Sequence, residues 1–322
     1  MKIVIPGGSG QVGTILARAF AADGHDVVIL SRGGARARQP WRTVVWDGRT
    51  LDAAWTREFE GTDVVINMAG HSVNCRYNEA NRKAIVDSRL DSTRAVGAAI
   101  AQCARPPGVW LQASTATIYA HRYDAANDEA TGILGGDEPG APDSWRFSID
   151  VARRWESAAM EAATPKTRKV LLRSAMTMSP DRNGVFDTLL GLVRRGLGGL
   201  SGDGRQYVSW IHESDFVRAI YWLIEHDGMA GPVNICSPHP LPNAEFMRTL
   251  REAWGIGFGL PAAAWMLEAG AVFLRTETEL ILKSRRVVPG RLLESGFQFE
   301  FADWGDAARD LCRRWRTARA TS

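Results

Sequence analysis

The sequence predicts an α/β fold in which a doubly wound parallel sheet is followed by a smaller, mainly helical C-terminal lobe. Two observations carry this prediction. The first half of the 322-residue chain alternates short β-branched runs with amphipathic helical stretches, and connections of that length suit the right-handed crossovers of a parallel sheet. After residue 235 the pattern becomes mainly helical.

The individual elements follow from hydrophobic periodicity and from turn residues. Strands are expected at residues 2–6, 26–30, 43–46, 63–67, 109–113 and 169–173. Helices are expected at residues 11–22, 78–103 and 145–163. Residues 121–144 and 196–206 are rich in turn-forming residues and are expected to be loops. A loop as long as the first one is usually functional or mobile.

We expect the chain to divide into two units. Residues 1–178 form the sheet domain, which is completed by about residues 210–235. Residues 179–209 and 236–322 form the smaller lobe, to which we assign substrate binding. This division gives each unit enough apolar residues for a core of its own.

Composition and charge exclude several classes of partner. The net charge is +3, from 39 basic and 36 acidic residues that are spread along the chain, so we expect no nucleic-acid partner. No apolar run reaches membrane-spanning length, so we expect no membrane partner. The four cysteines lack metal-ligand spacing, which predicts no metal site and a reducing, cytoplasmic location. The first strand begins at residue 2, which leaves no room for a signal peptide.

The strongest local signal is a glycine-rich segment between the first strand and the first helix. It consists of Gly7, Gly8, Ser9, Gly10, Gln11, Val12 and Gly13. Glycine at three-residue spacing lets backbone N–H groups approach a pyrophosphate, and the helix N-terminus favours the anion. The alternative is an ordinary tight turn. The surrounding strand and helix favour a Rossmann-type dinucleotide site.

The end of the second strand indicates which dinucleotide is bound. NAD-specific domains carry an acidic residue there, which accepts a hydrogen bond from the ribose 2′-hydroxyl. This chain has Ser31 and Arg32 instead. An arginine can form charge-assisted hydrogen bonds to a 2′-phosphate, with the serine as a further donor. We therefore predict NADP, although an exposed arginine in a turn would give the same pattern.

Two further strand ends fit the same site. Asp47 follows the third strand and could accept from the adenine amino group, or it could serve only its own turn. Met68, Ala69 and Gly70 follow the fourth strand with small side chains. They are expected to let the backbone lie against a ribose, since ligands bind at the carboxyl ends of strands in this architecture.

These segments resemble the extended short-chain dehydrogenase/reductase superfamily over nearly the whole chain. The similar motifs are its GxxGxxG at residues 7–13, its ribose motif at 67–70, its SSATVY-like stretch at 114–119, and the GDGxQ…IHxxD segment of nucleotide-sugar epimerases at 202–206 and 210–215. The resemblance implies a Rossmann fold, NADP binding and chemistry on a polar, nucleotide-linked small molecule.

The C-terminal half is similar to an atypical subfamily of epimerases that carries a C-terminal domain of unknown function. The similar segments are residues 234–238, 242–246, 286–289 and 296–299. That subfamily also has an RW…K…SR pattern, which is matched here by Arg76, Lys83, Ser88 and Arg89, with Tyr77 in place of the tryptophan.

The superfamily's usual catalytic pair is absent from the sequence. That pair is a tyrosine and a lysine four residues later on one helix face, where the ammonium lowers the pKa of the phenol. None of the five tyrosines is followed by lysine at this spacing. In the helix over residues 145–163, we expect Phe147 and Val151 to occupy the two positions.

The remaining catalytic candidates lie at the end of the fifth strand. Thr115, with Ser114 beside it, could hydrogen-bond a substrate oxygen, or it could cap the backbone. Tyr119 is the nearest phenol, and His121 could titrate near neutral pH. His212 is expected to cap or orient the following helix.

Two functions remain open at this stage. One is an NADP-dependent oxidoreductase or epimerase that acts on a small molecule. The other is a catalytically silent NADP(H)-binding protein that senses redox state or regulates a partner, which the missing tyrosine and lysine favour. The strand-end hydroxyl and the second lobe favour the enzyme. The oligomeric state is also open, with a homodimer as one alternative.

Overall fold

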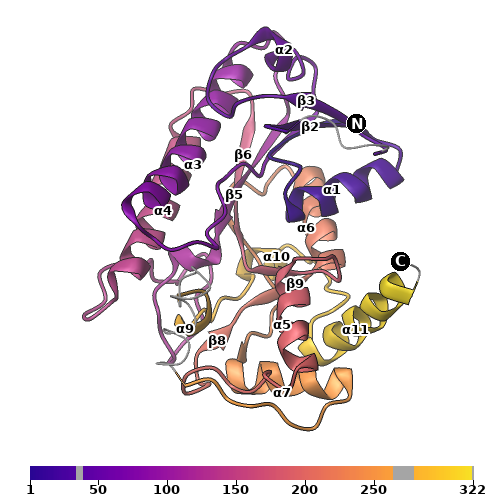
Figure 1. The fold of residues 1–322 in the computed structure, drawn as a ribbon. Helices are drawn as coiled ribbons and strands as arrows, with labels where there is room; N and C mark the ends of the chain where they lie inside the picture. The colour runs from indigo at the N-terminus through magenta and orange to yellow at the C-terminus, as the bar shows by residue number, and fades with distance from the viewer. Residues whose placement is uncertain (34–38, 264–278, 321–322) are drawn as a thin grey trace.

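The computed structural model describes residues 1–33, 39–263 and 279–320. A seven-stranded sheet forms its centre, in the order β10-β6-β5-β4-β1-β2-β3, and all neighbouring strands are parallel (Figure 1). The strands are β1 (Lys2–Pro6), β2 (Asp26–Ser31), β3 (Arg42–Val45), β4 (Val64–Asn67), β5 (Val109–Thr115), β6 (Arg168–Ser174) and β10 (Gly231–Ile235). The predicted doubly wound α/β fold is confirmed.

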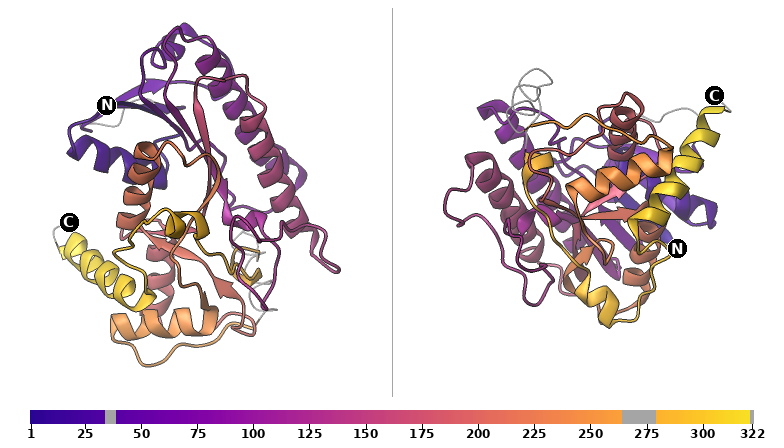
Figure 2. Two further views of the ribbon diagram at one scale, coloured as in Figure 1. Left: turned by 180° about the vertical axis from the view of Figure 1, so that it is seen from behind. Right: turned by 90° about the horizontal axis from the view of Figure 1, so that it is seen from below.

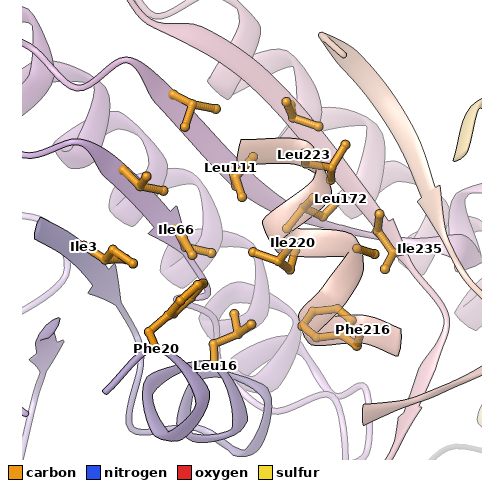
Figure 3. Close-up of a cluster of buried hydrophobic side chains, with 14 of the residues drawn as sticks. Ile3, Leu16, Phe20, Ile66, Leu111, Leu172, Phe216, Ile220, Leu223 and Ile235 are labelled. Atoms are coloured by element: carbon orange, nitrogen blue, oxygen red, sulfur yellow. The ribbon is translucent and has the colours of Figure 1, made fainter. Parts of the chain in front are cut away.

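Helices cover both faces of this sheet. The long helices that pack on it are α1 (Gln11–Ala22), α3 (Glu79–Ala101), α4 (Asp143–Met160) and α6 (Glu213–Glu225). Alternate residues of each strand point to opposite faces. Ile3 therefore packs towards α1 and α6, whereas Val4 packs towards α3. Figure 3 shows the first of these cores, with Phe20 of α1 and Ile220 of α6 against the strands.

The predicted sheet elements lie within a few residues of their observed bounds. The main extension is β5, which continues two residues past its predicted end to Thr115 because it pairs with β6 over its whole length. The chain also returns to the sheet late. Strand β10 pairs with β6, and α6 supplies Phe216 and Leu223 to the core on that face.

The C-terminal lobe is mainly helical, as predicted. Its helices are α5 (Val185–Arg194), α7 (Asn243–Trp254) and α11 (Trp304–Ala320), of which α7 and α11 lie side by side (Figure 2). They enclose a core in which the rings of Phe246 and Trp304 are stacked, with centroids 4.1 Å apart.

The structure also contains short elements that periodicity did not reveal. They are α2 (Ala53–Thr56), the 3-10 turn η1 (Ala116–Ile118), β7 (Met176–Met178) paired with β9 (Trp210–His212), β8 (Tyr207–Val208) paired with β11 (Leu241–Pro242), α9 (Glu279–Leu282) and α10 (Gly290–Glu294). Elements of two to five residues are too short to show a hydrophobic period.

The long loop over residues 121–144 is held at both the sheet and the C-terminal segment. Asn127 donates its backbone N–H to the carbonyl of Arg286 at 2.7 Å. The Glu129 carboxylate accepts from the backbone N–H groups of Asn234 at 2.7 Å and Arg291 at 3.2 Å. The loop therefore serves as a structural link between β10 and the last part of the chain.

Within the described ranges, no helix combines the length and the apolar character that crossing a membrane requires.

Candidate functional site

Two adjoining cavities follow the carboxyl ends of the strands. The larger, of about 680 Å³, is lined among others by Gly7, Ser9, Gly10, Ser31, Arg32, Asp47, Met68, Ala69 and Gly70. The smaller, of about 350 Å³, is lined among others by Gln11, Val12, Gly13, Ala113, Ser114, Ser174 and Thr177. Gly7, Gly10 and Met68 line both cavities. The structure thus brings the predicted cofactor residues together along one continuous surface, with Gly8 directly behind it.

The glycines of the loop differ in how much space each would leave for a side chain. A Cβ on Gly13 would lie 2.5 Å from the Cα of Gly8, so both are needed for close packing of α1 on the loop. Gly7 has a φ of +74°, and a Cβ there would meet the backbone of Ala69 at 2.5 Å. A Cβ on Gly10 would meet only the Gly7 carbonyl oxygen at 3.5 Å, an ordinary contact. The protein itself therefore tolerates a side chain at Gly10.

The space beside Gly10 fits the pyrophosphate of a dinucleotide. Gly10 is the N-cap of α1 and has no side chain to accept from the first-turn N–H groups, and that turn holds no acidic residue. Those N–H groups can bind an anion, which the helix dipole also favours. The residues present therefore fit the cofactor that the sequence predicts.

Ser31 and Arg32 lie at the end of β2, as predicted, but their roles differ. The Ser31 hydroxyl donates to Ser9 Oγ at 2.9 Å and accepts from the backbone N–H of Gly33 at 3.3 Å. In this arrangement Ser31 orients the glycine loop, which differs from the donor role that we predicted. Arg32 is exposed and lines the larger cavity, so it is the residue of this pair that can reach a 2′-phosphate.

Asp47 follows β3, the strand next to β2, and lines the same cavity as Arg32. Its Oδ1 accepts from the backbone N–H groups of Thr50 at 2.8 Å and Arg49 at 2.9 Å. Hydrogen bonds from Thr50 and Arg49 lower the pKa of the Asp47 carboxyl to about 2. The turn role weighed in the sequence is therefore present. The adenine contact stays a prediction, which the position of Asp47 in the cavity wall allows.

The loop after β4 is fixed by a buried amide. Asn67 Oδ1 accepts from the backbone N–H of Ala69 at 3.1 Å, and its Nδ2 donates to Gln112 Oε1 at 3.0 Å. Because Asn67 is fully buried, this pair holds Met68 and Gly70 against the cavity.

The two hydroxyl groups at the end of β5 are used differently. Ser114 lines the smaller cavity and donates to Glu156 Oε1 at 2.6 Å. Glu156 also forms a buried ion pair with Arg173 at 2.8 Å. Thr115 Oγ1 accepts from the backbone N–H of Thr117 at 3.1 Å. Thr115 therefore caps η1, which is the alternative that the sequence left open.

The structure does not place Tyr119 where a proton donor would be needed. Its side chain is only 2% exposed. The hydroxyl donates to Asn234 Oδ1 and accepts from Arg173 Nη1, both at 2.9 Å. Burial raises the pKa of the phenol above its usual value. Tyr119 lines neither cavity, so the catalytic role that we predicted for it is not supported by its position.

Phe147 and Val151 also differ from their predicted placement. The Phe147 ring packs edge-on against Tyr77, with centroids 5.1 Å apart. Val151 is buried in the same cluster with Ile85 of α3. Both side chains therefore pack against α3 and the residues just before it, and neither lines either cavity.

A neighbouring face of α4 points to the end of β5. Ala152 packs against Ala116 and Ile118 of η1, and Glu156, one turn later, accepts from Ser114. Ser148 lies one turn before Ala152. The helix positions that face the strand end are thus Ser148 and Ala152, one residue later than we predicted. Neither residue type can form a phenol–ammonium pair.

Two buried charged residues of the C-terminal segment, Glu279 and Lys283, lie next to this face of α4. Neither was identified from the sequence. The Glu279 carboxylate accepts from Ser148 Oγ, and Lys283 Nζ donates to the carbonyl of Thr117 at 2.7 Å. Burial lowers the pKa of Lys283 to about 8.

His121 Nδ1 accepts from the backbone N–H of Ser284 at 2.8 Å, and burial lowers the pKa of the His121 imidazole. Contacts between positions more than 100 residues apart leave no local signal.

His212 has the structural role that the sequence predicted. It is the N-cap of α6, and its Nδ1 accepts from the backbone N–H of Ser214 at 3.1 Å. Its Nε2 lies 3.2 Å from Asp310 Oδ2 of α11. The imidazole therefore joins α6 to the C-terminal helix.

Comparisons with known proteins agree with this geometry. The NAD dependent epimerase/dehydratase family matches residues 3–236, and the domain of unknown function DUF1731 matches residues 262–311. The chain is 29% identical over 314 residues to epimerase family protein SDR39U1 of Homo sapiens, which covers 97% of this chain and 99% of that protein. It is also 29% identical over 304 residues to epimerase family protein YfhF of Bacillus subtilis, at 94% and 95% coverage.

A solved structure is similar over the same length. The crystal structure of the human epimerase family protein SDR39U1, determined with NADPH, has a TM-score of 0.83 and 28% identity over 97% of this chain and 99% of that chain. The predicted resemblance to the extended superfamily and its subfamily is confirmed, and so is the expectation of a nicotinamide cofactor. The chain belongs to the NAD dependent epimerase/dehydratase family and carries the DUF1731 domain near its C-terminus.

Proposed function

We propose that this chain is an NADP(H)-dependent oxidoreductase or epimerase that acts on a small polar substrate, with nucleotide-linked sugars as the first class to test. The observation that carries the proposal is the continuous cavity wall along the strand ends. It runs from Arg32 at β2, past Gly10, to Ser114 at β5. A dinucleotide lying along this wall would have its nicotinamide at the β5 and β6 end, where the C-terminal lobe meets the sheet.

The choice of NADP over NAD rests on the end of β2. Arg32 lines the cavity there, and the strand ends without the carboxylate that would accept from a ribose 2′-hydroxyl. A guanidinium can bind a 2′-phosphate through charge-assisted hydrogen bonds. The human relative was crystallised with NADPH, which supports the same choice.

The nicotinamide ring supplies the hydride chemistry, and the protein positions the substrate against it. We assign the substrate oxygen to Thr115, which directly follows the cavity-lining Ser114 and, unlike the buried Tyr119, is partly exposed. Thr115 Oγ1 accepts from the backbone N–H of Thr117, which leaves the hydroxyl proton to be donated to a carbonyl or hydroxyl oxygen. Since Tyr119 is engaged elsewhere, we assign proton exchange with the substrate to water. Ser114 fixes Glu156 beneath the same position.

The second candidate function is a catalytically silent NADP(H)-binding sensor or regulator. The observation that favours it is the face of α4 that points to β5, where Ser148 and Ala152 provide neither a phenol nor an ammonium. A protein of this kind would keep the cofactor site intact and turn nothing over. A regulatory partner, or a second copy of the chain in a homodimer, would then read the bound cofactor.

One experiment separates the two. The protein is incubated with NADPH and a panel of carbonyl compounds, and the absorbance at 340 nm is followed. Nucleotide sugars are incubated with each oxidation state of the cofactor and analysed by chromatography, because an epimerisation consumes no net cofactor. If the protein is an enzyme, at least one compound is turned over, and this turnover is lost in the Gly10→Asp variant. Tight NADPH binding without turnover of any compound would favour the sensor.

We also propose a cytoplasmic location for the protein. All four cysteines are free thiols, and Cys236 and Cys312 are buried among apolar side chains. Such thiols fit a reducing compartment. A thiol reagent should leave these two unmodified in the native protein and should modify them after denaturation without a reductant, which would show that they are both buried and reduced.

A further inference from the structure

Arg89 is held in the contact between α3 and α4. Its guanidinium carbon lies 4.9 Å from the centroid of the Trp155 ring, in a cation–π arrangement. Its Nη1 donates to the carbonyl of His71 at 3.0 Å and to that of Ile85 at 3.1 Å. These contacts fix the plane of the guanidinium next to the loop that follows β4.

The positive charge of Arg89 has no ion-pair partner in the parts of the chain that the structure describes. Burial lowers the pKa of its guanidinium to about 10. Arg173, a more deeply buried arginine of this region, is paired with Glu156. Even partial burial of an uncompensated charge is costly, and one aromatic ring with two carbonyl groups offsets this only in part. A site that keeps such a charge is suited to an acceptor from a ligand.

Arg89 also retains hydrogen-bonding capacity. A guanidinium has five N–H donors in a planar fork, and the two carbonyl groups take only those of Nη1. Nε and Nη2 make no hydrogen bond within the described ranges, and neither atom is among those enclosed without a partner. These two nitrogens form the edge of the fork that can bind oxygen atoms side by side.

The guanidinium lies next to the cofactor cavity. A Cβ on Gly70, which lines that cavity, would be 3.2 Å from the Arg89 guanidinium carbon. The residues predicted to bind adenosine, Arg32 and Asp47, follow β2 and β3, on the opposite side of β1 from β4 and β5. Trp155 belongs to the helix that follows β5. Arg89 is therefore on the nicotinamide side of the site.

We propose that Arg89 binds the nicotinamide half of the dinucleotide, with Nε and Nη2 donating to oxygen atoms of its ribose or of the phosphate next to it. The superfamily's usual catalytic pair includes a positively charged lysine on the helix that corresponds to α4. In this chain the positive charge would come from Arg89 of α3. The proposal rests on the proposed NADP(H) binding, and it deepens that function by naming the residue that holds the reactive end of the cofactor.

Ligand titrations of the intact protein test this assignment without any need for turnover. Wild type, Arg89→Met and Arg89→Lys are titrated with NADPH and with adenosine 2′,5′-bisphosphate, which lacks the nicotinamide half. Arg89→Met is expected to raise the Kd for NADPH about tenfold or more, the loss of a charged hydrogen bond. The Kd for the bisphosphate should stay within about twofold, since no contact to it is lost.

The matched control is Arg32→Met, which removes the same type of side chain from the adenosine end. It is expected to raise the Kd for both ligands. Arg89→Lys is expected to recover part of the NADPH affinity, because lysine keeps the charge but not the planar fork. It also provides a folded variant for comparison if the methionine variant has a lowered Tm.

The oxygen acceptor is identified by two smaller ligands. Reduced nicotinamide mononucleotide contains both the ribose and its phosphate, whereas reduced nicotinamide riboside contains the ribose alone. Their inhibition constants are measured by displacement of NADPH. If Arg89 binds the ribose, Arg89→Met weakens both ligands. If it binds the phosphate, only the mononucleotide is weakened.

Three results would overturn the proposal. Equal loss of NADPH and bisphosphate affinity in Arg89→Met and Arg89→Lys would mean that Arg89 only supports the fold of the site. Unchanged affinity for both ligands would mean that it contacts neither. Failure of the wild type to bind NADPH would overturn the proposed function together with this inference. Binding without turnover would leave the assignment of Arg89 intact, so the two failures are distinguishable.

Discussion

Ser9 and Ser31 are joined by a 2.9 Å hydrogen bond between their side-chain oxygens. Ser9 belongs to the glycine loop and Ser31 ends β2, so the bond fixes the pyrophosphate loop relative to the residue that follows Ser31. That residue is Arg32, to which we assign the choice of cofactor. The hydrogen bond therefore links the two parts of the site to which we assign phosphate binding and cofactor selection.

The first prediction concerns cofactor choice. Arg32→Asp is expected to raise the Kd for NADPH about tenfold or more, because a charge-assisted hydrogen bond contributes about 1.5–3 kcal/mol and the new carboxylate repels the 2′-phosphate. NADH should be bound equally well or better, since aspartate can accept from a ribose 2′-hydroxyl. Fluorescence titration with both cofactors measures this. Equal loss for NADPH and NADH would show that Arg32 does not contact the 2′-phosphate.

The second prediction concerns the glycine loop. Gly10→Asp should abolish dinucleotide binding without unfolding the protein, because a Cβ at this position meets no close protein atom and a carboxylate there repels the pyrophosphate. The control is Gly13→Ala, whose Cβ would lie 2.5 Å from Gly8 and which should lower the Tm. Wild-type NADPH affinity in Gly10→Asp would mean that this loop does not hold the phosphates.

The third prediction tests the corrected orientation of α4. Phe147→Tyr with Val151→Lys adds the missing residue types at the positions that the sequence suggested. Because both side chains pack against α3 and its N-terminal flank and line neither cavity, we expect no gain in reductase activity. Lysine at the buried position of Val151 should cost about 3–5 kcal/mol as an unpaired charge. A urea titration measures this cost, with Phe147→Tyr alone as the control. A rise in carbonyl reduction by the double variant would contradict the orientation.

The fourth prediction is a pH dependence of stability that originates at His212. Burial lowers the pKa of this imidazole from its ordinary value of 6.5 to about 4 in the folded state. Between pH 6.5 and 4 the unfolded chain then binds more protons than the folded one, so stability falls as the pH falls through this window. The total loss approaches about 3 kcal/mol below pH 4.

The matched control for His212 is His212→Asn, which keeps an N-cap acceptor for α6. Urea unfolding of both proteins is measured from pH 7.5 to 4. The asparagine variant should be less stable at pH 7.5 and should lose less stability on acidification. The same slope in both proteins would assign the pH dependence to other groups.

The sheet could be predicted from the sequence because its signals are local. A strand such as β1 is a continuous apolar run, and the helix after it shows its amphipathic period within twelve residues. The cofactor loop has the same character, because glycine at positions 7, 10 and 13 between a strand and a helix constrains one short segment. The sequence does not show, however, that Gly13 is required for packing whereas Gly10 has room for a side chain. Only the structure shows this difference.

The substrate end of the site depends on contacts between distant segments, and there the sequence was less informative. The spacing of residues along α4 does not determine which of its faces points to the end of β5. The neighbours of Ala152 and Val151 decide this, and they come from η1 and α3. The position of Tyr119 is set by Asn234, 115 residues away. A strand-end hydroxyl or phenol is visible in the sequence, whereas its hydrogen-bond partner is not.

The late position of β10 in the sequence affects how the sheet forms during synthesis, because the chain leaves the ribosome from its N-terminus. One edge of β6 has no partner strand until Gly231–Ile235 has been made, and Leu292 and Phe297 complete the same core later still. In the nascent chain this edge of β6 is therefore open while residues 175–230 are made, and an open sheet edge is prone to pair with other chains. Chaperones that cover the edge during this interval should favour correct folding of the protein.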